Sequence, residues 1–149
     1  MEDLDSGGRA AVVTGGARGL GFEIARALLD RGYSVVITDL DEDDVADAAA
    51  RLGSGARGMA GDARDPESHR AAAAAAAEFG RLCVWVNNAG VARASKIWEH
   101  SDAEVEQLVR VNLLGVMHGS RVAVEAMRAD GGHLINVAST SALGPVPGL

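Results

Sequence analysis

Short apolar runs alternate with longer amphipathic stretches along this chain. The runs are nearly continuously apolar, which is typical of strands buried on both faces of a sheet. Strands are predicted at Ala10–Thr14, Ser34–Thr38, Leu82–Val86 and His133–Ala138, with a weaker candidate at Gly58–Gly61. The pattern therefore predicts five strands of one buried sheet.

The stretches between these runs have helical features. From Gly19 onward, apolar residues recur at helical spacing until Gly32 ends the segment. The acidic residues after Asp39 suit a first helical turn because the helix dipole favours negative charge there. Helices are expected over Gly19–Arg31, from residue 41 to about Leu52, from Asp65-Pro66 through the solvated alanine run Ala71–Ala77, and over Ser101–Ala129.

Strand and helix alternate through all five strands. Such alternation requires crossover connections and favours a parallel sheet. The sequence therefore predicts an α/β fold, with a doubly wound parallel sheet and helices on both faces. We expect a flexible N-terminus over residues 1–9 and one folded domain over residues 10–149, because no linker-like segment divides the chain.

Charge and cysteine content narrow the partners. The net charge of −7 argues against nucleic acid or an anionic membrane. Cys83 is the single cysteine and has apolar neighbours, so we expect a buried side chain and no disulfide or metal site. The acidic N-terminus lacks the features of a targeting signal, and no apolar run has the length of a bilayer span. These features predict a cytoplasmic protein.

The segment TGGARGLG, residues 14–21, follows a predicted strand and opens a predicted helix. In this context the glycines indicate a phosphate-binding loop. Gly15 permits a tight turn, Gly19 lets the backbone approach a pyrophosphate, and Gly21 lets helix and strand pack closely. The helix N-terminus would donate N–H groups to the phosphates. A purely structural glycine turn is the alternative explanation of this segment taken alone.

Acidic residues follow the second and third strands. The Asp39 carboxylate can accept hydrogen bonds from both ribose hydroxyls of an adenosine, and it would repel a 2′-phosphate. Arg18 points the other way because a cation can pair with that phosphate. We expect NAD, with NADP the less favoured cofactor. Asp62 closes the third strand, where its carboxylate can reach an adenine amino group or cap the next turn.

Amide side chains mark two further positions. The segment NNAG, residues 87–90, follows the fourth strand; its amides can fix neighbouring strands, and Ala89 and Gly90 leave room for a flat ligand. Asn112 lies on the apolar side of a predicted helix, although asparagine has a low helix propensity. Its amide therefore needs a hydrogen-bond partner.

Together with INVAST at residues 135–140, these segments resemble the short-chain dehydrogenase/reductase family in order and approximate spacing. The resemblance implies a Rossmann fold that binds NAD(H) or NADP(H) and transfers hydride to or from an alcohol or carbonyl carbon. It places the cofactor against Thr14, Gly15, Arg18, Gly19, Leu20, Gly21, Asp39, Asp62, Ala63, Asn88, Ala89 and Gly90. It also implies that Ser139 hydrogen-bonds the substrate oxygen, with Thr140 or Ser141 as alternatives, and that Asn112 holds a water in a proton relay.

The family's general acid/base is a tyrosine with a lysine four residues later. Counted from Ser139, that tyrosine would fall just past Leu149. The chain has one tyrosine, Tyr33, and one lysine, Lys96, so it contains no Tyr-x-x-x-Lys motif. We therefore expect a Rossmann domain that is incomplete at its C-terminal end and has little activity by itself. The full-length form is expected to act on a small alcohol or ketone and to form homo-oligomers.

Two other functions fit part of the sequence. A non-catalytic dinucleotide-binding or redox-sensing protein would share the cofactor motifs and would need no tyrosine. A methyltransferase would share the glycine-rich opening and an acid after the second strand, but NNAG and the pair Asn112 and Ser139 disfavour it.

Overall fold

The structure is a computed structural model that describes residues 8–144. Five parallel strands form one sheet in the order β3-β2-β1-β4-β5. The strands are β1 (Arg9–Thr14), β2 (Ser34–Asp39), β3 (Ala56–Ala60), β4 (Arg81–Asn87) and β5 (His133–Asn136). The chain winds outward from β1 to β3 and then returns to place β4 on the other side of β1. This reversal opens a crevice at the carboxyl ends of β1 and β4, where sheets of this type bind ligands.

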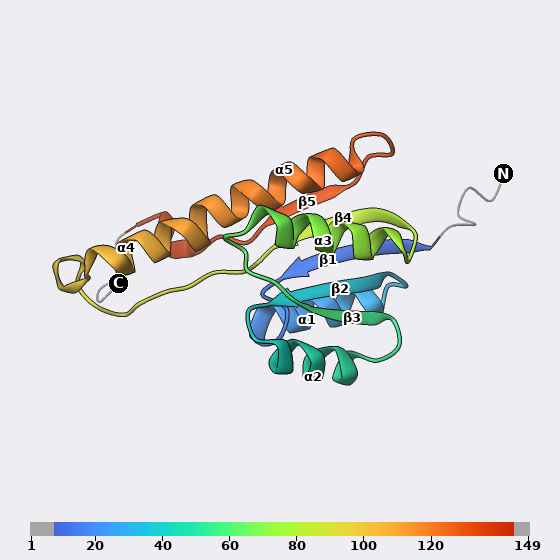
Figure 1. The fold of residues 1–149 in the computed structure, drawn as a ribbon, viewed down its shortest axis with the longest axis horizontal. Coiled ribbons are helices and arrows are strands. Elements are labelled where there is room, and N and C mark those ends of the chain that lie inside the picture. The colour runs from blue at the N-terminus through green and yellow to red at the C-terminus, as the bar shows by residue number, and fades with distance from the viewer. Residues whose placement is uncertain (1–7, 145–149) are drawn as a thin grey trace.

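Helices cover both faces of the sheet, as the alternating sequence predicts (Figure 1). They are α1 (Gly19–Leu29), α2 (Glu42–Leu52), α3 (Pro66–Ala77), α4 (Asp102–Val109) and α5 (Val116–Met127). The helices α1 and α2 pack on one face, whereas α3 and α5 pack on the other. The predicted doubly wound α/β fold is therefore confirmed.

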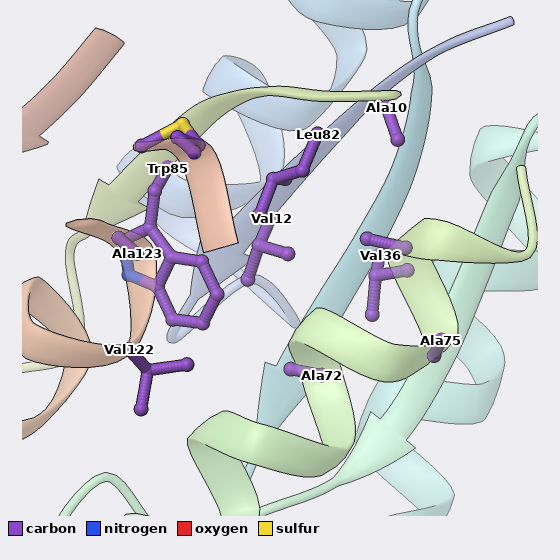
Figure 2. Close-up of a cluster of buried hydrophobic side chains, with 11 residues drawn as sticks. Ala10, Val12, Val36, Ala72, Ala75, Leu82, Trp85, Val122 and Ala123 are labelled. Atoms are coloured by element: carbon purple, nitrogen blue, oxygen red, sulfur yellow. The ribbon is translucent and has the colours of Figure 1, made fainter. Parts of the chain in front are cut away.

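Alternate residues of the strands supply two separate cores. Val12 and Val36 face α3 and α5, while the neighbouring Val13 and Ile37 face α1 and α2. Trp85 is fully buried in the first core, where Figure 2 shows its indole ring close to Val122 of α5. Burial of both faces explains why the middle residues of β1, β2 and β4 are apolar.

Local sequence sets the starts of the helices. The Asp41 side chain accepts the Asp44 N–H at the start of α2, and the Asp65 side chain accepts the Glu67 N–H at the start of α3. Ser101 forms a capping box with Glu104 at the start of α4. Each cap satisfies N–H groups that have no partner inside the helix.

The structure corrects several element predictions. The long helical region predicted over Ser101–Ala129 spans residues 102–127, but it contains a π-helical turn, Arg110–Gly115, between α4 and α5. The alanine run of α3 is not simply solvated, because Ala72, Ala75 and Ala76 are buried in the first core. Asp62 does not close β3, which ends two residues earlier at Ala60.

The ends of the predicted domain are partly outside the described residues. Residues 1–7 of the predicted flexible N-terminus and residues 145–149 of the predicted domain lie there, whereas Arg9 is the first residue of β1. Cys83 is buried, as expected. No helix in the described part of the chain has the length and apolar character needed to cross a membrane.

Candidate functional site

A cavity of about 270 Å³ opens at the carboxyl ends of the first four strands. Ten of the predicted cofactor residues line it: Gly15, Arg18, Leu20, Gly21, Asp39, Asp62, Ala63, Asn88, Ala89 and Gly90. Seven further residues complete the wall and were not predicted: Thr38, Leu40, Gly61, Arg64, Val91, Gln107 and Val111. Segments far apart in the sequence therefore meet around one space.

Glycines shape the loop between β1 and α1. Gly15 and Gly19 have left-handed backbones, with φ values of 64° and 56°. A Cβ at Gly21 would lie 2.1 Å from the Gly15 carbonyl oxygen, so a side chain at residue 21 would force the helix away from the strand. A Cβ at Gly19 would meet nothing within 4 Å, so the backbone there is open to a ligand.

The N-terminus of α1 adjoins this open glycine. The first N–H groups of an α-helix have no partner inside the helix and carry partial positive charge. No side chain among residues 8–144 caps α1, and Arg18, which precedes it, has an extended backbone. The helix end therefore has the donors that an anionic group needs.

Thr14 and Asn88 join β1 to β4 beside the cavity. The Thr14 hydroxyl oxygen accepts the backbone N–H groups of Asn88 and Ala89, each at 3.1 Å. The Asn88 amide donates to the carbonyl oxygens of Thr14 and Gly15, at 3.0 and 2.9 Å. Thr14 is buried and does not line the cavity, so its contribution is to hold the glycine loop against the NNAG segment.

Asp39 is held in place by backbone groups. Its Oδ2 accepts the Ala17 N–H at 3.1 Å, and its Oδ1 accepts the Leu40 N–H at 2.9 Å. A carboxylate oxygen can accept more than one hydrogen bond, so both oxygens keep capacity for ligand hydroxyls. Arg18 lines the same cavity and forms no ion pair within the described residues.

Arg64 binds the carboxylate of Asp62, a partner that the sequence analysis missed. The Arg64 Nε lies 2.9 Å from each carboxylate oxygen, and Nη2 lies 2.6 Å from Oδ2. This hydrogen-bonded guanidinium holds the pKa of Asp62 below its usual value. Asp62 is therefore an ionised carboxylate paired with Arg64. The position of Arg64, only two residues after Asp62, was the sequence signal from which this pair could have been predicted.

Asn112 finds its hydrogen-bond partner in the segment after β4. Its Oδ1 accepts the Val91 N–H at 2.9 Å, and its Nδ2 donates to the Val91 carbonyl oxygen at 2.7 Å. Asn112 lies in the π-helical turn, and such turns occur frequently at functional sites. The amide thus fixes the position of Val91, which lines the cavity, while Asn112 itself does not line it.

Ser139 lies just beyond β5 and precedes a short 3₁₀ turn, Thr140–Ala142. Its hydroxyl oxygen accepts the Ser141 N–H at 3.1 Å, and the side chain is exposed. Ser139 does not line the cavity. The β5 strand is fixed to β4 by Asn87, whose buried amide donates to the Asn136 side chain at 2.8 Å.

The chain's single tyrosine and single lysine lie apart from these residues. Tyr33 precedes β2, at the opposite end of that strand from Asp39, and the Arg9 guanidinium lies 4.5 Å from the centre of its ring. Lys96 lies over the ring of Trp98, which is 76% exposed. Neither side chain lines the cavity.

Comparisons with known proteins agree on one family. The profile of the short chain dehydrogenase family matches residues 9–149. The chain is 37% identical over 138 residues to a 3-alpha-(or 20-beta)-hydroxysteroid dehydrogenase of Mycobacterium tuberculosis, covering 91% of this chain and 53% of that protein. It is 39% identical over 145 residues to D-threitol dehydrogenase of Mycolicibacterium smegmatis, covering 94% and 56%.

Solved structures show the same similarity. A short chain dehydrogenase/reductase from Burkholderia phymatum in complex with NAD superimposes with a TM-score of 0.89 and 32% identity, over 96% of this chain and 53% of that one. An actinorhodin polyketide ketoreductase with NADPH gives 0.87 and 30%, over 95% and 57%. The chain spans about half the length of the curated relatives it matches.

Proposed function

The chain belongs to the short-chain dehydrogenase/reductase family of oxidoreductases, and on that basis we propose that it binds NAD as part of an enzyme acting on a small alcohol or ketone. One observation carries the proposal: an uncapped helix N-terminus, a pinned carboxylate and a second acidic turn surround a single cavity. These groups match, in order, the pyrophosphate, ribose and adenine of a dinucleotide.

The residues present fit such a cofactor. The open backbone at Gly19 and the first N–H groups of α1 would hold the pyrophosphate. Asp39 would accept hydrogen bonds from the adenosine ribose, and the turn containing Asp62 and Ala63 would contact the adenine. Ala89 and Gly90 would leave room for a flat ring. When bound, the cofactor supplies a nicotinamide ring that accepts or donates hydride.

We propose NAD rather than NADP because of Asp39. Its two oxygens are fixed by the Ala17 and Leu40 N–H groups, so the carboxylate cannot easily turn away from a 2′-phosphate. Arg18 is the competing influence, since it lines the same cavity and has no ion-pair partner in the described residues. The two structural relatives carry NAD and NADPH respectively, which leaves the choice to these two residues.

For catalysis, Ser139 would donate a hydrogen bond to the substrate oxygen, with Thr140 and Ser141 as the neighbouring alternatives. Asn112, whose amide is hydrogen-bonded to Val91, would hold a water of the proton relay. Tyr33 lies at the wrong end of β2 to act as the general acid/base. We therefore propose that these 149 residues bind the cofactor but do not turn over an alcohol.

The deciding experiment is an isothermal calorimetric titration of the purified chain with NADH, with NADPH and with S-adenosylmethionine. We expect saturable NADH binding, weaker NADPH binding and no binding of S-adenosylmethionine. The same sample should show no alcohol-dependent reduction of NAD⁺. Absence of NADH binding to a folded chain would contradict the cofactor proposal, and efficient turnover would contradict the requirement for a further tyrosine.

A non-catalytic dinucleotide-binding or redox-sensing protein is the second candidate. It would use the same cavity for the dinucleotide and would need no tyrosine near Ser139. A sensor should distinguish the redox states of its ligand, so its affinities for NAD⁺ and NADH should differ by tenfold or more, on the order of 1.4 kcal/mol. Equal affinities would count against sensing.

We also propose a homo-oligomer for the full-length protein and a cytoplasmic location. The helical segment from α4 to α5 exposes apolar side chains on the described structure, including Val109 (46%), Leu113 (54%) and Met117 (58%). Exposed apolar patches of this kind mark association surfaces. Sedimentation of the full-length protein as a monomer at micromolar concentration would contradict this part of the proposal.

A further inference from the structure

A buried histidine contacts the turn that follows β3. His69 lies in α3 and is 3% exposed. Its Nε2 lies 2.8 Å from the carbonyl oxygen of Ala63. A carbonyl oxygen only accepts, so this ring nitrogen carries a proton and donates it to the hydrogen bond.

The His69 ring is held from its other sides. Its centre lies 6.0 Å from that of Trp85, with the two planes inclined by 44°. A Cβ added at Gly119 of α5 would lie 3.2 Å from the His69 Cε1 atom. This close approach of the helix backbone leaves the imidazole little freedom to turn away from Ala63.

Burial also keeps the imidazole neutral at pH 7. Loss of hydration lowers the pKa of His69, and the nearby His118 of α5 acts in the same direction. The hydrogen bond to Ala63 and the carboxylates of Asp65 and Asp62 oppose this effect. A neutral imidazole in this tautomer has one N–H donor, and that donor is committed to Ala63.

The turn that His69 contacts forms part of the cavity wall. Asp62, Ala63 and Arg64 all line the cavity. A Cβ at Gly115 would lie 3.0 Å from the Ala63 carbonyl oxygen. The carbonyl oxygen therefore has two close neighbours, the imidazole of α3 and the backbone of the π-helical turn.

We propose that His69 is a positioning residue for adenine recognition: its Nε2–H fixes the Ala63 carbonyl and thereby holds the Asp62 carboxylate in place to read the adenine amino group. This inference rests on the proposed binding of an adenine dinucleotide. His69 does not line the cavity and acts only through the backbone of Ala63. Its effect should therefore be confined to the adenine end of the ligand.

The test compares NAD⁺ with nicotinamide hypoxanthine dinucleotide, in which an oxygen replaces the adenine amino group. Wild type should prefer NAD⁺ because a carboxylate accepts from an amino group but not from a carbonyl oxygen. His69→Leu replaces the imidazole by an apolar side chain of similar size and removes the Nε2–H donor. We expect it to weaken NAD⁺ binding by about five- to tenfold, the effect of losing one buried hydrogen bond, and to reduce the preference for NAD⁺.

Two further variants separate positioning from general destabilisation. His69→Gln keeps a side-chain N–H and should restore much of the NAD⁺ preference. Gly115→Ala leaves His69 intact, favours the helix, and crowds the Ala63 carbonyl from the π-helical turn, so it should also reduce the preference. His133→Gln, at the exposed start of β5, is the matched control and should bind both dinucleotides like wild type.

The outcomes are distinct. If the wild-type chain is folded but binds neither dinucleotide, the proposed function itself is wrong. Wild-type binding of NAD⁺, together with an unchanged ratio of the two affinities in both His69→Leu and Gly115→Ala, would overturn the role of His69 alone. If His69→Leu does not fold, Gly115→Ala decides the question: a reduced preference for NAD⁺ supports the role of the Ala63 carbonyl, and an unchanged ratio overturns it.

Discussion

The hydroxyl oxygen of Thr14 accepts two backbone N–H groups, and the amide of Asn88 returns two hydrogen bonds to the loop after Thr14. This reciprocal pairing joins the central strands β1 and β4 at the point where the strand order reverses. The glycine loop and the NNAG segment, which both line the cavity, are therefore held at a fixed separation.

Replacing Thr14 by valine tests that pairing. The side chains have the same shape, but valine leaves the half-buried N–H groups of Asn88 and Ala89 without an acceptor. We expect the free energy of unfolding to fall by about 2–4 kcal/mol, measured by urea denaturation. Thr14→Ser keeps the hydroxyl and should lose far less. Equal losses in the two variants would show that the methyl group, rather than the hydrogen bonds, is responsible.

Asp39→Ala tests the choice of cofactor. Loss of the ribose contact should weaken NAD⁺ binding by roughly 1–3 kcal/mol, while NADP⁺ binding should improve because a repulsive charge is removed. Calorimetric titration of both cofactors measures the two effects. Arg18→Ala is the companion variant and should lower NADP⁺ affinity more than NAD⁺ affinity. If Asp39→Ala binds NAD⁺ as tightly as wild type does, the ribose assignment is wrong.

Two glycines of the same loop should differ in their response to alanine. Gly21→Ala would place a Cβ against the backbone oxygen of Gly15, so the helix must shift and the melting temperature should fall further than in Gly19→Ala. Gly19→Ala meets no atoms and should cost about 1–2 kcal/mol, through its left-handed backbone alone. Comparison of the two melting temperatures checks this order, and a more harmful Gly19→Ala would contradict the geometry.

His69 should make stability depend on pH. Because burial lowers the pKa of His69, the unfolded chain binds a proton more readily than the folded chain. Stability should therefore fall as the pH drops below about 6.5, the ordinary histidine value, toward the lower pKa of the folded state. The slope of the unfolding free energy against pH should be smaller in His69→Gln than in wild type. All other titrating groups are common to the two proteins and contribute equally. Parallel stability curves from pH 7.5 to 5 would exclude this contribution.

The strands and the glycine loop could be predicted because their signals are local. A few consecutive residues determine the backbone conformation in the apolar run Ser34–Thr38 and in the glycine loop from Gly15 to Gly21. Most of the predicted cofactor residues consequently line the cavity. The predicted strand ends were less accurate. Asp62 follows the predicted third strand directly in the sequence, but in the structure it lies in a turn after β3.

The features that were missed depend on contacts between distant segments. The π-helical turn at Asn112 accompanies hydrogen bonds to Val91, twenty-one residues earlier, and the apolar periodicity gives no sign of it. The burial of Ala72 in α3 depends on the packing of that helix against the sheet, whereas composition alone suggests an exposed alanine run. The role of His69 likewise appears only when α3 and the turn after β3 are seen together.

The π-helical turn also restricts how the length of this segment can change. A π turn contains about one residue more than an α turn, and each helical residue advances the direction of the side chains by about 100°. Deleting one residue between Arg110 and Gly115 would leave a regular helix with α5 in nearly its present orientation, because the π turn absorbs its extra residue locally. The wide turn that carries Asn112 would be lost, and with it the hydrogen bonds to Val91. A single-codon deletion here should therefore disturb the cavity wall at Val91 more than the packing of α5 against the sheet.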